Sequence, residues 1–256
     1  MKNSIVLLLV ALCSFSVFAE EDASQDAGNA WSVSLSQTFA DKYVWRGIQF
    51  NGEGVSQTEV SIGYDAGDAG TFGLAVWGNL DLDSENTTAG QFSELDYVLS
   101  WEKTYDNITA TAGFIFYDFS EVGLGDTQEF YVGVTLDTVP FAPSLTVYYD
   151  IEDADGFYVE ANASHSFALG ESHTLDLGAT LGWADEDQGA NYYGGANSGV
   201  AHYSLSASVD FPVGESLTIT PSIMYYSLLS DANDLIGADG GEDDDFVFGI
   251  NASFTF

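Results

Sequence analysis

The sequence predicts an all-β protein: a transmembrane, antiparallel, up-and-down β-barrel of about twelve strands, after a cleaved signal peptide. Three observations predict this fold class. The chain begins with an export signal, and nearly all of the remainder alternates between apolar and polar residues. Aromatic residues gather at both ends of the alternating segments. Together these features indicate a barrel in the bacterial outer membrane.

Residues 1–19 have the three parts of a secretory signal peptide. Lys2 gives a positive start, and Ile5 to Val17 form an apolar run that is short for a bilayer span. The following Phe18-Ala19 completes a cleavage site, so we expect cleavage after Ala19. A membrane anchor is the alternative interpretation of this segment.

Cys13 is the only cysteine of the chain and lies inside this apolar run. A lipoprotein attachment site there is disfavoured, because Leu12 is too large for the residue that precedes a lipidated cysteine. Once the signal peptide is removed, the exported chain has no cysteine and cannot be a disulfide-stapled scaffold.

The charge of the mature chain is strongly negative. Removal of 19 residues leaves 256 − 19 = 237, and loss of Lys2 leaves 4 − 1 = 3 basic residues against 40 acidic ones, a net charge of −37. Nucleic acid and anionic lipid are therefore poor partners. The acidity does not indicate disorder, since 46% of the residues are hydrophobic and 14% are aromatic. Only residues 20–30 read as a flexible N-terminal segment, which leaves 31–256 for the barrel.

Twelve segments alternate with a period of two, and most have the 9–11 residues of a membrane strand. They are 31–40, 55–64, 71–82, 92–102, 108–117, 128–137, 144–151, 157–168, 173–183, 200–211, 217–227 and 246–256. The connections alternate between short and long, apart from the short link 152–156. Bacterial barrels have short periplasmic turns and long outer loops, so both ends of the barrel domain are expected on the periplasmic side.

One alternate set of residues is nearly all apolar, and the other is mostly Ser, Thr, Gly, Asn, Tyr, Asp and Glu. A soluble β-sandwich would bury the apolar set, so alternation alone does not distinguish it from a barrel. The aromatic residues of the apolar set favour the barrel, because they form two bands that bracket aliphatic residues. The periplasmic band is Trp31, Tyr64, Phe72, Trp101, Phe167, Phe211 and Phe256; the outer band is Phe116, Phe130, Tyr149, Phe157, Trp183, Tyr203, Tyr225 and Phe246.

The last segment, FVFGINASFTF, ends the chain on an aromatic residue. This ending resembles the C-terminal signal by which outer-membrane proteins are recognised for insertion. We therefore predict that Phe254 and Phe256 are the assembly signal and that the outer-membrane assembly machinery is a partner.

The stretch TFADKYVWRGIQF, from Thr38 to Phe50, and the stretch LAVWGNLDL, from Leu74 to Leu82, resemble the opening of the TorF-like family of bacterial outer-membrane porins. The matching positions are Tyr43, Trp45, Arg46-Gly47, Trp77 and Asn79. The motif covers the first third of the chain, and the residues after Arg-Gly are less polar than in the family. The resemblance implies a barrel porin and supplies no substrate.

The polar, inward set is acidic. Its acids are Glu59, Asp81, Glu94, Asp96, Glu129, Asp150, Glu160, Asp176 and Asp210. The mature chain opposes them with only Lys42, Arg46 and Lys103, so we expect a pore wall that sets cation selectivity. The alternative is a solvated acidic surface suited to a salty habitat, bridged by divalent cations to lipopolysaccharide.

Two further features of the inward set concern the lumen. Five tyrosines in the outer halves of their strands are candidate lumen aromatics that stack on a solute or fill space: Tyr117, Tyr131, Tyr148, Tyr158 and Tyr226. Arg46 is the only arginine, and a bidentate pair with a carboxylate would tether the first loop inside the barrel mouth.

Twelve strands lie between the filled eight-stranded barrels and the open porins, so we expect a narrow pore for passive passage of small solutes. The alternative is a non-conducting structural or adhesive barrel with a plugged lumen. Neither an enzyme nor a cofactor is expected, because His165, His173 and His202 suggest no catalytic triad. No metal site is expected either, since Ile151 occupies the first ligand position before the calcium-like run Asp153–Gly156.

Overall fold

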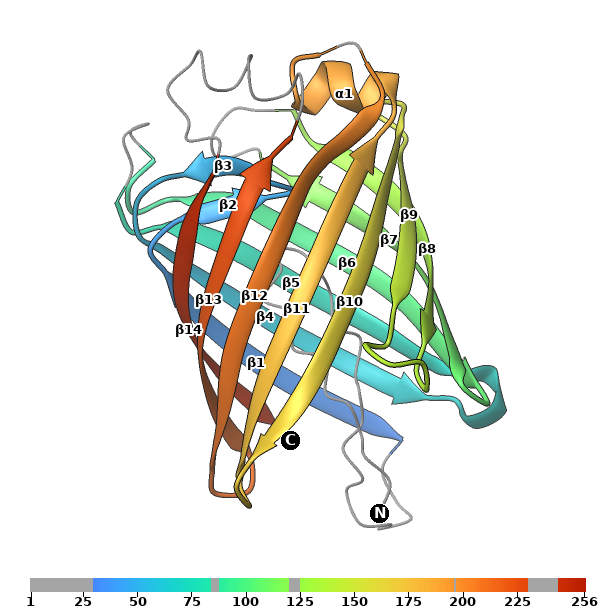
Figure 1. Cartoon of the computed structure of the whole chain (residues 1–256), viewed down its shortest axis with the longest axis vertical. Helices are drawn as coiled ribbons and strands as arrows, with labels where there is room; N and C mark the ends of the chain where they lie inside the picture. Colours follow the sequence, from blue (N-terminus) through green and yellow to red (C-terminus); the bar gives the residue numbers. More distant parts are fainter. Residues whose placement is uncertain (1–29, 84–87, 120–124, 196, 230–243) are drawn as a thin grey trace.

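The computed structural model describes residues 30–83, 88–119, 125–195, 197–229 and 244–256. Twelve antiparallel strands close into a barrel, because β1 pairs with β4 on one side and with β14 on the other (Figure 1). The predicted signal peptide and nearly all of the predicted N-terminal segment lie outside the described residues. The C-terminus lies at the end of the barrel opposite to helix α1 (Glu186–Tyr192), and we call the α1 end the outer mouth.

The predicted all-β fold class and its twelve strands are confirmed, with ends that differ by at most a few residues. The strands are β1 (Trp31–Ala40), β4 (Val55–Asp65), β5 (Thr71–Asp81), β6 (Phe92–Tyr105), β7 (Ile108–Asp118), β8 (Thr127–Leu136), β9 (Ser144–Asp150), β10 (Phe157–Leu169), β11 (His173–Ala184), β12 (Gly199–Val213), β13 (Leu217–Leu228) and β14 (Asp244–Thr255). A 3-10 turn (Gly67–Ala69) joins β4 to β5. Among the described residues, no helix is long and apolar enough to cross a membrane.

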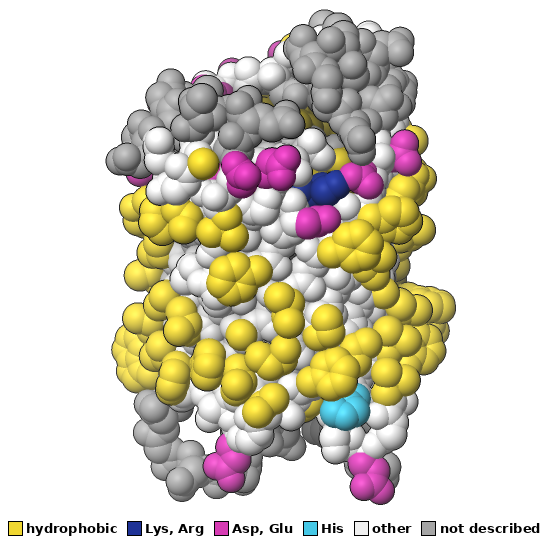
Figure 2. Space-filling view, turned by 90° about the vertical axis from the view of Figure 1, so that its left-hand side faces the viewer, with side chains coloured by type: hydrophobic (Ala, Val, Ile, Leu, Met, Phe, Trp, Pro, Cys, Tyr) yellow, Lys and Arg dark blue, Asp and Glu magenta, His cyan; other side chains and the backbone are white. Residues whose placement is uncertain are grey.

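The apolar alternate set faces outward. Leu74, Leu99 and Val132 are 56%, 56% and 59% exposed. Exposing this much apolar surface costs free energy in water but not in lipid. Figure 2 shows apolar side chains in a wide belt, with acidic side chains towards the two ends of the molecule. Aromatic rings of neighbouring strands pack against each other in both predicted bands, as in the Trp31–Tyr64 pair with centroids 4.7 Å apart.

Gln37 is a polar residue on the outer face of β1, between the exposed Leu35 and Phe39. Its amide donates to Ser56 Oγ at 2.9 Å and to the Gln57 carbonyl at 3.1 Å, and accepts from Thr58 Oγ1 at 2.6 Å. These bonds with β4 satisfy the amide within the belt, where an unpaired polar group would cost several kcal/mol.

In the periplasmic half of the barrel, the wall carries small polar side chains on the face that lines the lumen. Ser34 bonds to Ser61 at 2.6 Å, and Asn251 donates to Thr38 at 2.8 Å across neighbouring strands. Many other inward positions at this level are small as well: Gly73, Ser100, Thr111, Gly133, Thr146, Ser164, Gly178, Ser206, Ser208, Ser222 and Ser253. Larger inward residues at this level include Glu102, opposite Thr111, and Asp176, opposite Ser208. We infer that this predominantly small wall leaves a polar lumen that its side chains do not fill completely.

Candidate functional site

A two-stranded hairpin, β2 (Tyr43–Trp45) and β3 (Ile48–Asn51), lies within the outer mouth of the barrel (Figure 1). It forms its own sheet, separate from the barrel, and every residue from Tyr43 to Ile48 is buried. In the described part of the chain, no backbone hydrogen bond links these two strands to the wall. The hairpin is therefore held in the lumen by its side chains.

The tip of the hairpin is the Arg-Gly pair of the sequence motif. Trp45 and Ile48 pair with each other, and the two residues between them, Arg46 and Gly47, have φ angles of 49° and 82°. Two successive positive φ angles define the tight turn that matches the twist of a hairpin. Gly47 also lies against the wall, since a Cβ atom there would be 2.5 Å from His202 Cβ. The turn thus projects the guanidinium of Arg46 across the lumen.

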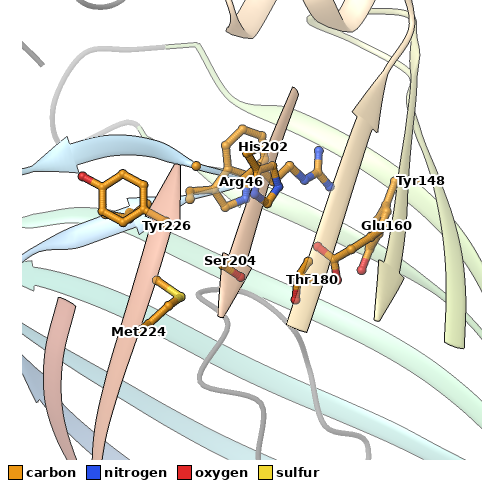
Figure 3. A pocket seen from close by; sticks show the side chains of 11 residues that line it. Arg46, Tyr148, Glu160, Thr180, His202, Ser204, Met224 and Tyr226 are labelled. Atoms are coloured by element: carbon orange, nitrogen blue, oxygen red, sulfur yellow. The ribbon is translucent and has the colours of Figure 1, made fainter. Parts of the chain in front are cut away.

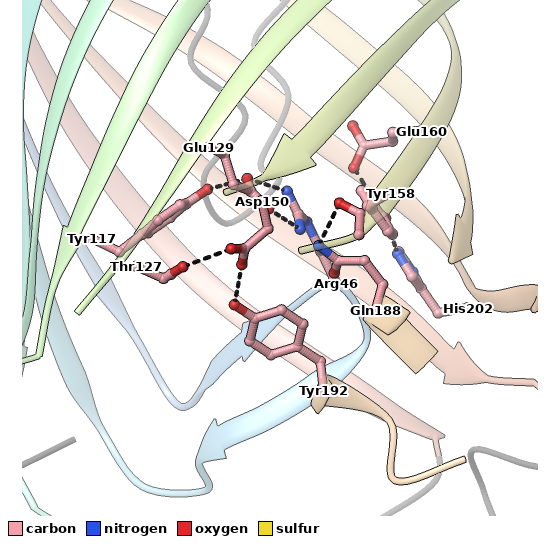
Figure 4. A network of polar contacts seen from close by, with 11 residues as sticks. Arg46, Tyr117, Thr127, Glu129, Asp150, Tyr158, Glu160, Gln188, Tyr192 and His202 are labelled. Atoms are coloured by element: carbon pink, nitrogen blue, oxygen red, sulfur yellow. Dashed lines mark hydrogen bonds and ion pairs between the residues drawn. The ribbon is translucent and has the colours of Figure 1, made fainter. Parts of the chain in front are cut away.

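Arg46 forms a bidentate ion pair with Glu129 of β8. Its Nη1 and Nη2 donate to Glu129 Oε1 and Oε2 at 2.8 and 2.7 Å, and Tyr117 donates to Oε2 at 2.8 Å (Figure 4). Both members of the pair are buried, with side chains 6% and 1% exposed. Two parallel charge-assisted bonds fix direction as well as distance, so the pair sets the position of the hairpin tip.

Aromatic rings surround the guanidinium. Its central carbon lies 4.4 Å from the ring centroid of Trp45, 4.7 Å from that of Tyr148 and 4.0 Å from that of Tyr158. Cation–π attraction is strongest for desolvated cations. These rings therefore stabilise a charge that Glu129 alone would leave poorly solvated.

Helix α1 supports the hairpin from the outer side. Tyr193 donates its hydroxyl to the Arg46 carbonyl at 3.0 Å, and the ring of Tyr192 packs edge-on against Trp45 with centroids 5.2 Å apart. Burial raises the pKa of Tyr193 above its ordinary value, so the hydroxyl stays protonated and keeps donating. Asp185 caps the helix by accepting from the Gln188 N–H at 3.0 Å.

Three more side-chain contacts anchor the hairpin around the wall. Tyr43 donates to Glu94 of β6 at 2.6 Å, and Tyr226 of β13 donates to Gln49 at 3.2 Å. Asn51 donates to the carbonyl of Asp83 at 2.9 Å. The hairpin is thus bound on several sides of the lumen.

The predicted acids all lie on the inward face, and the structure divides them into three groups. Glu129 pairs with Arg46, and Asp150 accepts from Thr127 at 2.9 Å and Tyr192 at 2.6 Å (Figure 4). Asp81, Glu94 and Asp96 are buried behind the hairpin near β5 and β6. The remaining four, which lie lower on the wall or against the inner side of the hairpin, are Glu59, Glu160, Asp176 and Asp210.

The three basic residues of the described part of the chain are all engaged in contacts. Lys42 pairs with Asp245 at the outer rim, and Lys103 donates to the carbonyl of Asp68 at the periplasmic end. With Arg46 bound to Glu129, none of the three offers an unpaired charge to the lumen. Apart from Glu129, the predicted inward acids have no basic partner among the described residues.

The five predicted lumen tyrosines cluster around the hairpin. Tyr117 and Tyr158 are 2% and 0% exposed, and Tyr158 lies 2.6 Å from His202 Nε2 through its hydroxyl. The ring of Tyr148 packs between those of Tyr131 and Tyr158, with centroids 5.7 and 5.9 Å away. Tyr226 bonds to Gln49 of the hairpin. At the other end of the barrel, Phe256 is 73% exposed beside Phe254, with centroids 6.5 Å apart.

Comparison with solved structures finds the same fold. The chain resembles the KdgM porin with a TM-score of 0.51 and 10% identity, over 88% of this chain and 99% of that one. It resembles LpxR from Salmonella typhimurium with a TM-score of 0.54 and 8% identity, over 88% of this chain and 100% of that one. At such identities the likeness shows the fold alone. The protein is an outer-membrane β-barrel. No protein-family model matches the chain, and neither does any curated protein.

Several residues of the site are absent from the sequence-based expectations. The hairpin strands, helix α1 and the residues Gln188, Tyr192 and Tyr193 fall in segments read as loops. The helix has seven residues, too few to show a helical stripe. For the hairpin there was a usable signal, since Arg46-Gly47 is a two-residue turn with glycine in its second position.

Proposed function

We propose that this barrel is a narrow outer-membrane channel for small solutes, with the β2–β3 hairpin as its constriction and a preference for cations and neutral molecules. The observation that carries the proposal is the contrast along the axis. The periplasmic half of the wall bears mostly small polar residues. The outer mouth is occupied by one hairpin that, among the described residues, contacts the wall through side-chain interactions. Such a lumen is suited to aqueous passage. The resemblance to TorF-like porins supports the same interpretation.

The preference for cations rests on the acids without a basic partner. One carboxylate about 4 Å from an ion contributes about 4 kcal/mol at an effective dielectric constant of about 20, reduced by salt over about 10 Å. Glu59 and Glu160 face the lumen, and Arg46 is neutralised by Glu129. The net field in the lumen therefore disfavours anions.

The test is single-channel recording of the purified protein in a planar bilayer with a potassium chloride gradient. We expect discrete current steps and a reversal potential on the cation side. Replacing both Glu59→Gln and Glu160→Gln should move the reversal potential towards zero, whereas the matched exposed control Glu186→Gln should leave it unchanged. A preference for chloride in the wild type would contradict the proposal.

A second candidate function is a plugged, non-conducting barrel, favoured by the complete burial of Tyr43 to Ile48. It predicts a silent wild type and current steps only after the hairpin is removed. No catalytic function is proposed, since His202 contacts Tyr158 and not Ser204 within the described hydrogen bonds.

A further inference from the structure

A cavity lies on the inner side of the hairpin, between its tip and strands β9 to β13 (Figure 3). The hairpin contributes Val44 to Gly47, and the barrel wall contributes the remaining lining residues. The empty space measures about 460 Å³ with the solvent at its mouth.

His202 forms part of the cavity wall beneath the hairpin tip. The side chain is buried, with 4% of its surface exposed, and its Nε2 lies 2.6 Å from the Tyr158 hydroxyl. Its other ring nitrogen, Nδ1, has almost no accessible surface. His202 therefore shapes this wall and offers the cavity no free hydrogen-bonding atom.

Two walls of different character line the space. Glu160, Thr180 and Ser204 provide one carboxylate and two hydroxyls beside His202 (Figure 3). Glu160 already accepts from Asn162 at 2.9 Å on Oε1 and from Tyr158 at 3.5 Å on Oε2, and each oxygen has one further acceptor position. Opposite these groups lie the ring of Tyr226 and the side chain of Met224. Convergent polar groups facing aromatic and apolar surface are the usual lining of a small-molecule site.

The charges around the cavity define the kind of ligand. The Arg46 guanidinium at its edge is satisfied by Glu129 at 2.7 and 2.8 Å, so it offers little to an anion. Glu160 has no basic partner among the described residues and repels a carboxylate or a phosphate. Hydroxyl groups both donate and accept, which suits one carboxylate together with two hydroxyls.

We propose that this cavity is a binding subsite for a small neutral polyol, such as a sugar or sugar alcohol, whose hydroxyl-bearing end bonds to Glu160, Thr180 and Ser204 beneath the constriction. The inference names a solute class for the proposed channel and rests on that function for the route of the solute. A polyol held there lies directly against the hairpin tip, at the point where the lumen narrows.

Trp45 lines the cavity and reports binding without any current. In purified protein in detergent, glycerol, sorbitol and glucose are titrated against tryptophan emission, with gluconate as the anionic comparison and calorimetry as a second measurement. We expect a saturable change for at least one neutral polyol, loss of the change in Trp45→Phe, and binding that is at least about tenfold weaker for gluconate.

Variants separate the subsite from unspecific effects. The double variant Thr180→Val, Ser204→Ala and the single variant Glu160→Gln should each weaken polyol binding about tenfold, a loss of about 1.4 kcal/mol. Ser206→Ala is the matched control, because Ser206 lies one inward position further along β12 and outside the cavity lining. Equal binding in all variants, tighter binding of gluconate, or no saturable signal by either method would overturn the inference.

The outcome is independent of the channel proposal. Polyol binding in a barrel that carries no current refutes the channel and keeps the subsite. A conducting barrel without polyol binding refutes the subsite and keeps the channel.

Discussion

Ala40 in β1 lies directly opposite Val55 in β4, although 55 − 40 − 1 = 14 residues separate them along the chain. Strands β1 and β4 therefore pair along their whole length without the segment between them. This segment, with its hairpin, is an insertion into the lumen. Its removal should leave the twelve-stranded wall intact.

The first prediction follows from this pairing. Replacement of Tyr43–Asn51 by a Gly-Ser linker should preserve the barrel and increase single-channel conductance several-fold, because the hairpin no longer occupies the outer mouth. Heat-modifiable migration on a gel checks that the barrel is folded. A linker of the same kind in place of the exposed turn 170–172 is the control and should leave conductance unchanged. Wild-type conductance in a folded barrel that lacks the hairpin would show that the hairpin is not the constriction.

The second prediction concerns the Arg46–Glu129 pair. Arg46→Ala leaves Glu129 buried without its partner, which should destabilise the docked hairpin by about 3 to 5 kcal/mol. We expect faster protease cleavage within residues 41–54 and noisier current. The double variant Arg46→Met, Glu129→Leu should recover much of the loss, since no buried charge remains unpaired.

The matched control for this pair is Lys42→Ala at the outer rim. Lys42 and Asp245 are more exposed, with side chains 13% and 29% accessible, and pairs at the surface contribute about 1 kcal/mol or less. Equal protease sensitivity of Lys42→Ala and Arg46→Ala would contradict the special role of the buried pair.

The third prediction concerns the hairpin turn. Gly47→Ala should displace the hairpin, because the residue has a φ of 82° and its new Cβ would lie 2.5 Å from His202 Cβ. Trp45 emission should shift towards that of exposed tryptophan. Gly54→Ala is the control, since the nearest atom to its added Cβ is the Ala40 carbonyl oxygen at 3.9 Å. An unchanged spectrum for Gly47→Ala would show that the tip is not confined.

The fourth prediction is a pH dependence at Tyr193. Its pKa is raised by burial, so the folded state holds the proton more tightly than the unfolded state does. The contribution of Tyr193 is therefore fully present below its ordinary pKa of about 10 and is lost as the pH rises beyond that value. Hairpin protection from protease should stay constant between about pH 6 and 9 and fall above about pH 10. In Tyr193→Phe the remaining fall should be smaller; an equal fall in both proteins would assign it to other groups.

The fifth prediction concerns assembly. Phe256→Ser, or deletion of Phe254–Phe256, should lower the amount of barrel in the outer membrane, because the last strand loses its exposed interfacial aromatics. Membrane fractionation with the heat-modifiability assay measures this amount. Thr255→Ser is the neighbouring control. Wild-type levels after both Phe changes would show that the terminal stripe is an ordinary strand pattern.

The sequence by itself determined the barrel, its strand number and its two faces. A strand in lipid must form backbone hydrogen bonds with a neighbour on each side, and its side chains must alternate between lipid and lumen. Each segment from 31–40 to 246–256 shows this alternation. The aromatic bands also indicated where the two membrane interfaces cross the barrel, as in Trp31 with Tyr64 and Tyr225 with Phe246.

Only the tertiary structure decided what occupies the lumen. The sequence indicated that Arg46 would pair with a carboxylate, but nine inward acids were candidates. Glu129 is the partner because the hairpin turn directs Arg46 towards β8. That choice divides the acids into compensated and uncompensated ones. The same holds for the cavity, whose lining combines the hairpin tip with Glu160 from β10 and with His202 and Ser204 from β12. Contacts between segments this far apart have no local periodicity, so only the closed barrel brings them together.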